Sequence, residues 1–335
     1  MLALIFAIMI SFFAVLFLTP SVKKFLERAD VAGVDQQKKK KPKMATSAGI
    51  LIMASIMVGG FFFIGANTFL VHEYLNLTYL LAAYCSIFMV AFIGFLDDLN
   101  VSKKPKRNKG VEDIRIGLKQ WQKPLLTLPA AIPLMAVMAG TAVMDVPFIG
   151  HFDFGIVYPL LLIPLAVVVV SNTTNMLAGM NGLETGLGIV SMFSLGLYTL
   201  MMGRTEASVI AFTLCFSLLA FLKWNWFPAK FLPGDSLTYL TGASFAAIVI
   251  IGNIEKFGIV VFTPWIIEFF LKLRSGFRAR SLGNLQKDGT LSAPYKKTYS
   301  LTHAVMKIRP MKEWQISAVL ISFEAVICTL AFVLM

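Results

Sequence analysis

Carboxylate and amide side chains gather in three short stretches, each beside a long apolar run. Asp97 and Asp98 close the segment FIGFLDDLN, and Asp235 follows Pro-Gly in LPGDSLTYL. The third stretch, NTTNMLAGMNGLETG (residues 172–186), supplies Asn172, Asn175 and Asn181. Magnesium takes oxygen ligands, keeps several waters and needs few protein groups beside substrate phosphates. The stretches therefore predict a site for a Mg²⁺-bound phosphate, with Mn²⁺ as an alternative ion.

Three cations suit the same chemistry. Lys123 stands at the start of an apolar run in KQWQKPLLTL, and Arg278 and Arg280 flank Ala279 in the last polar loop. If the apolar run lies in a membrane, an ammonium at its start can hold the phosphate of a lipid. Two guanidiniums suit bidentate capture of diphosphate oxygens.

Each stretch also has an ordinary structural interpretation. The aspartate pair could mark a helix end, and Asp235 could cap the helix that follows it. Lys123 could be a snorkelling anchor, and the asparagine-rich stretch could be a tight turn. Basic residues just after a helix often serve topology alone. No single stretch decides between these alternatives, but all five together hold the groups needed for a diphosphate site.

The surrounding sequence predicts an integral membrane protein. Of the 335 residues, 57% are hydrophobic and only 14% are charged, which is too apolar for a soluble domain of this length. Runs of about 20 apolar residues indicate spanning helices. We predict an all-α protein with a single membrane domain over residues 1–335 and ten spans, at about 2–19, 46–66, 77–96, 122–143, 156–171, 186–202, 206–222, 237–253, 257–273 and 314–334.

The cations predict the orientation. All of the thirty Lys and Arg residues except Arg204 and Lys256 fall in alternate loops. The positive-inside rule makes these loops cytosolic and places both termini on the other side. The cytosolic loops are expected at about 20–45, 97–121, 172–185, 223–236 and 274–313, so every candidate residue lies at the cytosolic face. The net charge of +12 is then a topology signal, and no nucleic-acid partner is expected.

The stretches resemble a known family, the polyprenyl-phosphate N-acetylhexosamine-1-phosphate transferases. NTTNMLAGMNGLETG is similar to the signature of the eukaryotic and archaeal branch, the UDP-GlcNAc:dolichyl-phosphate GlcNAc-1-phosphotransferases. The Asp-Asp pair and the Gly-Asp-Ser segment follow in the family's order, and the resemblance runs from about Gly33 to Tyr295. It implies transfer of GlcNAc-1-phosphate from UDP-GlcNAc to dolichyl or another polyprenyl phosphate, with Mg²⁺ and release of UMP.

The resemblance also implies roles for single residues. Asn175 and Asp235 match the magnesium ligands, and Lys123, with Asn172 beside it, matches the lipid-phosphate site. Asp97 and Asp98 match a catalytic aspartate pair that acts with Lys123. The predicted site for the UDP-sugar comprises Val34, Asp35, Gln36, Thr46, Asn181, Arg278 and Arg280, with Asn181 matching the residue that reads uracil.

Two departures from the family's pattern concern the sugar. Ala279 stands where that branch usually has a histidine between its arginines, and Ala45-Thr46 stands where a Pro-Glu is usual. These changes leave the N-acetylhexosamine open more than the reaction class.

Several alternatives remain open at this stage. The aspartate pair either orients Lys123 and metal-bound waters or acts as a base. A homodimer is an alternative to a monomer, and the short external loops favour an archaeal cell membrane over the endoplasmic reticulum. A transporter of nucleotide sugars is the alternative function, with residues 172–186 as an unwound binding segment.

Overall fold

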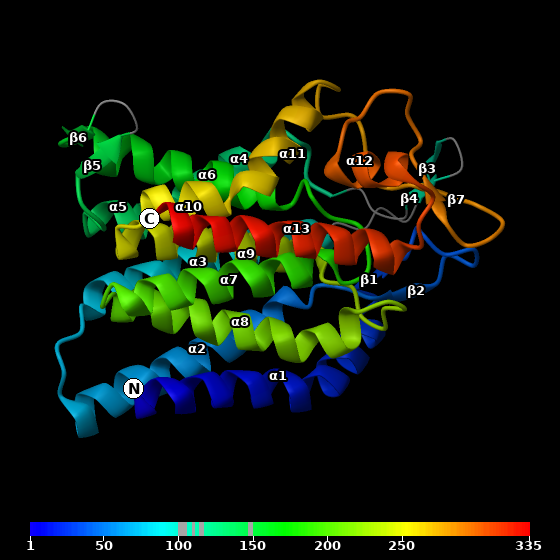
Figure 1. The fold of residues 1–335 in the computed structure, drawn as a ribbon. Helices are drawn as coiled ribbons and strands as arrows, with labels where there is room; N and C mark the ends of the chain where they lie inside the picture. Colours follow the sequence, from blue (N-terminus) through cyan, green and yellow to red (C-terminus); the bar gives the residue numbers. More distant parts are fainter. Residues whose placement is uncertain (100–105, 109–110, 114–116, 147–149) are drawn as a thin grey trace.

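The computed structural model describes residues 1–99, 106–108, 111–113, 117–146 and 150–335. Long helices run side by side and dominate the fold (Figure 1). Among the described residues, seven helices are long and apolar enough to cross a membrane. They are α1 (Leu2–Arg28), α2 (Gly49–Ala66, continued by η1, Asn67–Val71), α3 (Leu77–Leu99), α7 (Leu183–Met201), α8 (Thr205–Asn225), α9 (Gly234–Gly252) and α13 (Glu313–Leu334).

The other three predicted spans contain helices that are divided into shorter pieces. The prediction for 122–143 was too long, because the helix ends at Ala136 and a strand begins at Val143. Prolines explain the divisions, because proline lacks the N–H that a helix interior uses; Pro124, Pro129 and Pro133 recur through the first of the three segments. The pieces are α4 (Gln122–Thr127), η2 (Leu128–Ala131) and α5 (Ile132–Ala136); η3 (Tyr158–Leu162) and α6 (Ile163–Thr174); and α10 (Glu255–Val261) and α11 (Thr263–Leu273).

The connections contain short strands that the all-α prediction did not include. In the part of the chain that the structure describes, four two-stranded antiparallel hairpins lie outside the helices. A further short helix, α12 (Leu301–Ile308), lies in the last loop. The hairpins are β1 (Ala32–Val34) with β2 (Lys43–Ala45), β3 (Lys106–Asn108) with β4 (Val111–Asp113), β5 (Val143–Val146) with β6 (Gly150–Asp153), and β7 (Asn284–Leu285) with β8 (Leu291–Ser292).

Both termini lie at one end of the bundle, whereas β1, β2, β7 and α12 gather at the other (Figure 1). The long loops therefore share one end of the molecule, as the alternation of the cations predicts. The predicted loop over about 97–121 lies partly outside the described residues.

Helix α9 is the centre of the bundle. Most of its residues are buried, and it packs against α2, α3, α6, α7 and α8. Two glycines of neighbouring helices allow close approaches to its first turn. A Cβ on Gly49 would lie 2.3 Å from the carbonyl carbon of Ser236, and one on Gly94 would lie 2.7 Å from the backbone oxygen of Asp235. Helices α2 and α3 thus fix the turn that carries Asp235.

A buried histidine in α12 gives a prediction about stability. His303 has no exposed surface, and burial, with the nearby charge of Lys272, lowers its pKa to about 4. In an unfolded chain the pKa of histidine is about 6.5. Between about pH 4 and that value the unfolded chain therefore binds more protons than the folded one, and the free energy of unfolding falls as the pH falls. We expect the midpoint of thermal unfolding to drop across that range, and to drop less in His303→Gln. Equal slopes for the two proteins would contradict this.

Candidate active site

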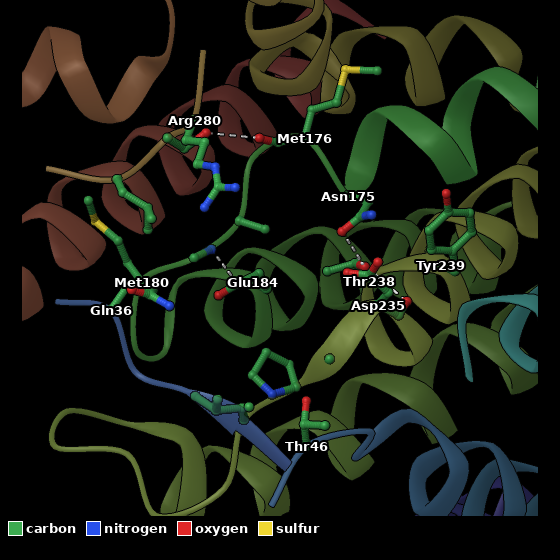
Figure 2. A pocket seen from close by; sticks show the side chains of 18 of the residues that line it. Gln36, Thr46, Asn175, Met176, Met180, Glu184, Asp235, Thr238, Tyr239 and Arg280 are labelled. Carbon is green, nitrogen blue, oxygen red and sulfur yellow. Dashed lines mark hydrogen bonds between the residues drawn. The ribbon is translucent and has the colours of Figure 1, made fainter. Parts of the chain in front are cut away.

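One cavity of about 960 Å³ collects residues from six separate parts of the chain. Every residue that the sequence singles out lines it, except Asp97 and Asp98. Figure 2 shows several of these side chains pointing into a common space between α9, the β1–β2 segment and the stretch that leads from α6 to α7. The lining residues predicted from sequence are Val34, Asp35, Gln36, Thr46, Lys123, Asn172, Asn175, Asn181, Asp235, Arg278 and Arg280.

Lys123 joins two carboxylates at this cavity. Its Nζ forms an ion pair with Asp97 and lies 3.2 Å from Oδ2 of Asp235. Asp97 is 4% exposed, and its other oxygen accepts the backbone N–H of Leu118. Because Asp97 is fixed at both oxygens, it holds the ammonium against Asp235. An interaction of Asp97 with Lys123 is what the orienting alternative requires.

Whereas Asp97 contacts Lys123, Asp98 contacts the start of α9. Its Oδ1 accepts the backbone N–H of Asp235 at 3.0 Å, and its Oδ2 accepts the N–H of Ser236 at 3.1 Å and the hydroxyl of Ser47 at 2.7 Å. A carboxylate on these amides satisfies donors of the first turn of α9 and complements the helix dipole. Asp98 is 1% exposed and acts on the cavity through the backbone of Asp235.

Asn175 and Asp235 meet at Thr238 (Figure 2). The Thr238 hydroxyl lies 3.0 Å from Oδ1 of Asn175 and 3.0 Å from the backbone oxygen of Asp235. The two predicted ligands thus present an amide oxygen and a carboxylate to one region of the cavity. Within the described residues no cluster of three His, Cys, Asp or Glu side chains could hold a metal. An oxygen-only set of two groups fits Mg²⁺, which completes its shell with water and phosphate.

Asn172 braces three helices. Its amide nitrogen donates to the Thr127 hydroxyl at 3.1 Å and to the carbonyl of Val168 at 2.8 Å, and its oxygen accepts the Tyr239 hydroxyl at 3.0 Å. These contacts link α6 to α4 and α9. The predicted role of Asn172 at a lipid phosphate stays a prediction, and the structure adds a bracing role.

Asn181 lies near the start of α7 and takes part in several hydrogen bonds. Its side-chain oxygen accepts from Nζ of Lys38 at 3.0 Å and from the N–H of Ala229 at 2.9 Å, and its nitrogen lies 3.2 Å from Oδ2 of Asp35. The backbone N–H of Asn181 donates to Glu313 at 2.7 Å, and Glu313 also pairs with Lys38. The carbonyl of Asn181 accepts the Ser317 hydroxyl at 3.0 Å. Asn181 is therefore held rigidly where it lines the cavity.

The loop between α1 and α2 forms the β1–β2 hairpin and lines the cavity near Asn181. Val34 pairs with Lys43 in this hairpin, and the N–H of Asp35 donates to Pro42 at 3.0 Å. Thr46, which is 1% exposed, bonds through its N–H to Val31 at 3.2 Å. These pairings place the segment containing Gln36 beside Asn181, although the two are far apart in the sequence.

Arg278 and Arg280 lie in an extended segment after α11 and are both exposed at the cavity wall. In Figure 2 the guanidinium of Arg280 is directed into the space on the side of Glu184. The cavity thus has cations from α4 and from the last loop, with carboxylate and amide oxygens between them. Such a set can hold a metal-bound diphosphate and neutralise charge that develops on it.

Comparisons with known proteins identify the family of the chain. Residues 77–253, more than half of the chain, match glycosyl transferase family 4. The chain belongs to this family. The matched range includes the aspartate pair, Lys123, the asparagine-rich stretch and Asp235.

Relatives extend the likeness over the whole chain. A protein of Saccharolobus solfataricus, provisionally named UDP-N-acetylglucosamine–dolichyl-phosphate N-acetylglucosaminephosphotransferase, is 33% identical over 99% of this chain and 97% of its own length. The Dictyostelium discoideum protein of that name is 27% identical over 75% of this chain and 67% of its own. A phospho-N-acetylmuramoyl-pentapeptide-transferase of Clostridium botulinum is 30% identical over 68% and 66%.

In this member of glycosyl transferase family 4, the cavity is also lined by residues that the sequence did not single out. Thr238, Tyr239 and Glu184 line the cavity, and Glu184 accepts the N–H of Gly179 at 2.6 Å. Thr238 and Tyr239 lie one helical turn after Asp235, which is a signal that could have found them. Glu313 carries no such signal, because it reaches Asn181 from the far end of the chain.

Proposed function

We propose that this protein transfers GlcNAc-1-phosphate from UDP-GlcNAc to dolichyl phosphate or a related polyprenyl phosphate and releases UMP. The observation that supports it most strongly is the convergence of Lys123, Asn175, Asp235 and the two arginines on one cavity, in a chain of glycosyl transferase family 4. Two of the relatives described above, from Saccharolobus solfataricus and Dictyostelium discoideum, are named for transfer of N-acetylglucosamine phosphate to dolichyl phosphate.

The reaction transfers the β-phosphoryl group of UDP-GlcNAc, with its GlcNAc attached, to the lipid phosphate. An oxygen of the lipid phosphate attacks the β-phosphorus of UDP-GlcNAc, a new P–O bond forms, and the bond from that phosphorus to the bridging oxygen breaks. UMP leaves with the electron pair of that bond. Charge spreads over the equatorial oxygens of a largely dissociative transition state. Lys123, Arg278 and Arg280 stand where they can neutralise it.

We propose Asn175 and Asp235 as the residues that hold Mg²⁺, with Mn²⁺ as a substitute. When bound, the ion supplies Lewis-acid stabilisation to the phosphate oxygens. Lys123 lies 3.2 Å from Asp235, so the lysine and the metal site share one carboxylate. Asp97 keeps the ammonium in that position by pairing with it from the other side.

Proton abstraction is not needed to start the reaction. A phosphate monoester has a second pKa near about 6 and is mostly a dianion at neutral pH. The contacts of Asp97 and Asp98, to Lys123 and to the first turn of α9 respectively, support orientation over base catalysis.

We propose further that all ten helical segments cross or enter the membrane and that the loop-rich end faces the cytosol, with both termini outside. The alternation of the cations supports this arrangement, as does the position of both termini at the end away from the cavity loops (Figure 1). The short external loops favour an archaeal cell membrane.

The test is UMP release by the purified protein. UDP-GlcNAc, Mg²⁺ and dolichyl phosphate are supplied together, and each is omitted in turn. Release that depends on all three supports the transferase. Absence of release with any UDP-N-acetylhexosamine, together with exchange of labelled nucleotide sugar across proteoliposomes, would support the transporter instead.

The network around Asn181 gives a prediction for this reaction. In Glu313→Gln, the N–H of Asn181 loses a charged acceptor, and Lys38 loses one of its two ion-pair partners and keeps Asp35. Charge-assisted hydrogen bonds of this kind contribute more than neutral ones, so we expect the KM for UDP-GlcNAc to rise about ten-fold. The KM for dolichyl phosphate should stay near its original value.

Glu255→Gln is the matched control for this prediction. Glu255 is also the first residue of its helix, α10, and bonds Tyr158 at 3.0 Å, outside the cavity. An equal change in both KM values in Glu313→Gln, or a change of the same size in Glu255→Gln, would contradict a role at the nucleotide end.

A further inference from the structure

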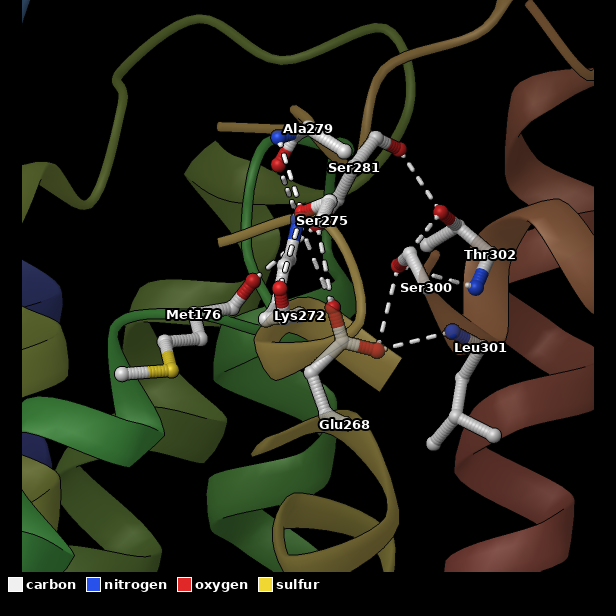
Figure 3. Close-up of polar contacts among 9 residues, drawn as sticks. All are labelled: Met176, Glu268, Lys272, Ser275, Ala279, Ser281, Ser300, Leu301 and Thr302. Atoms are coloured by element: carbon white, nitrogen blue, oxygen red, sulfur yellow. Dashed lines mark hydrogen bonds and ion pairs between the residues drawn. The ribbon is translucent and has the colours of Figure 1, made fainter. Parts of the chain in front are cut away.

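A buried ion pair contacts the chain segment that carries the two arginines. Glu268 and Lys272, one turn apart on α11, are 0% and 5% exposed, and their charged atoms lie 3.5 Å apart. Neither belongs to the residues that the sequence or the proposed reaction uses. Figure 3 shows the pair at the centre of contacts that reach the segment after α11, the stretch after α6 and the start of α12. We call residues 275–281 the arginine loop.

The ion pair holds the arginine loop at the residue between the two arginines. Nζ of Lys272 donates to the carbonyl of Ala279 at 2.9 Å. The N–H of Ala279 donates to the hydroxyl of Ser275 at 3.2 Å, and that hydroxyl bonds the carbonyl of Lys272 at 2.8 Å. Both backbone groups of Ala279 are therefore tied to the end of α11, which fixes the direction in which Arg278 and Arg280 leave the chain.

A second set of contacts ties this loop to the metal-binding side of the cavity. Lys272 donates to the Ser281 hydroxyl at 2.7 Å, and that hydroxyl lies 3.0 Å from the carbonyl of Met176 and 3.3 Å from Oε1 of Glu268. Met176 follows Asn175 in the chain. A shift of Lys272 would thus change the spacing between the arginines and Asn175.

The second carboxylate oxygen of Glu268 accepts hydrogen bonds at the start of α12. Oε2 accepts the N–H of Leu301 at 2.7 Å and the hydroxyl of Ser300 at 3.1 Å. Thr302 then donates to the carbonyl of Ser281 at 2.7 Å. One carboxylate therefore joins the arginine loop to the start of α12, and its charge complements the helix N-terminus.

The loop is held in a conformation that it would not adopt freely. Gly276 and Phe277 have φ values of 60° and 59°. A bulky residue rarely occupies this left-handed region, and such strain persists only where surrounding contacts impose it. Phe277 immediately precedes Arg278, so the imposed conformation sets where that guanidinium starts.

We propose that Glu268 and Lys272 are positioning residues that hold Arg278 and Arg280 at a fixed distance from Asn175 and so set the affinity for the diphosphate of the nucleotide sugar. The proposal rests on the proposed function. Replacing a buried ion pair by apolar residues of similar size is often harmless to stability, so a charged pair with contacts to three segments fits a geometric role.

The test compares Lys272→Met and Glu268→Gln with Glu324→Gln. Glu324 is a matched control because its carboxyl is also 0% exposed in a helix, α13, but contacts Cys328 away from the cavity. Misplacement of about 1 Å can cost about 10²-fold. We expect each α11 variant to raise the KM for UDP-GlcNAc about ten-fold or more, and to leave the KM for dolichyl phosphate within about two-fold.

A double-mutant cycle separates positioning from general destabilisation. Binding of UDP-GlcNAc is measured by calorimetry in wild type, Lys272→Met, Arg280→Ala and the double variant. If Lys272 acts through the arginine loop, Arg280→Ala costs much less in the Lys272→Met background than alone. Fold-losses that multiply, or equal rises in both KM values, would overturn the proposal.

Two milder variants cover the case in which the ion-pair variants do not fold. Ser275→Ala and Ser281→Ala remove the hydroxyls that tie down Ala279 and Met176, and each should raise the KM for UDP-GlcNAc selectively by about three-fold. Unchanged values in both would overturn the proposal. A wild-type protein that binds UDP-GlcNAc without releasing UMP would refute the proposed function instead, and the binding cycle would still report on positioning.

Discussion

Lys123→Met is expected to reduce lipid-dependent UMP release by about 10³-fold. The substitution removes the cation that lies 3.2 Å from Asp235 and pairs with Asp97. It therefore leaves two carboxylates close together without their shared partner, and it removes positive charge where the transition state becomes more negative. We expect the loss mainly in kcat, measured at saturating concentrations of both substrates.

Lys119→Met is the control for this variant. Lys119 is exposed and lies four residues earlier in the same polar segment, so it tests loss of a surface charge alone. It should retain nearly full activity. A Lys123→Met protein that folds and works within about two-fold of wild type would contradict the role given to this ammonium.

Asp98→Asn is expected to lower kcat by about 10²-fold without changing the shape of the pH–rate profile. Asp98 accepts the N–H groups of Asp235 and Ser236 and the Ser47 hydroxyl. An asparagine has only one oxygen to offer, so at least one of these donors loses its acceptor. Leaving a buried donor unpaired costs about 1–3 kcal/mol, and the first turn of α9 with Asp235 would move.

The pH–rate profile distinguishes the two roles of Asp98. A bell lowered only in height agrees with orientation through α9. Loss of the acidic limb in Asp98→Asn would identify this carboxyl as a base and would contradict the role argued here. Ser47→Ala, which removes only one of the three contacts, should show a smaller fall of the same kind.

The sequence predicted the helices well because apolar periodicity and length are local properties. Within the described residues, helical segments lie at all ten expected places, although the one expected at 122–143 ends at Ala136, and seven meet the length and hydropathy of a span. The breaks within 122–143 and 257–273 could have been read from Pro124, Pro129, Pro133 and Pro264. The hairpins were harder to predict, because strands of two to four residues have too few positions to show alternation.

The cavity could be predicted as a set of residue types but not as a geometry. Motifs identified Asn175, Asp235 and Lys123 because their neighbours in sequence carry the pattern. They could not separate the roles of Asp97 and Asp98, since adjacent residues on a helix point in different directions: one reaches Lys123, and the other reaches the first turn of α9. The partners Glu313 and Glu268 lie far away in sequence from the groups that they hold.

The structure also gives a context for Ala279, which replaces a histidine usual in the related branch. Its backbone carbonyl and N–H bond Lys272 and Ser275, and these groups are present whatever the side chain. The position can therefore keep the arginines in place while its side chain varies.

The fate of the β-phosphorus tests the central claim most directly. UDP-GlcNAc labelled at that phosphorus is incubated with the protein, Mg²⁺ and dolichyl phosphate, and the products are separated into lipid and aqueous fractions. Phosphoryl transfer predicts that the label enters the lipid together with GlcNAc and that the released UMP is unlabelled. Label recovered as UDP would mean that the sugar alone is transferred, and it would contradict the account.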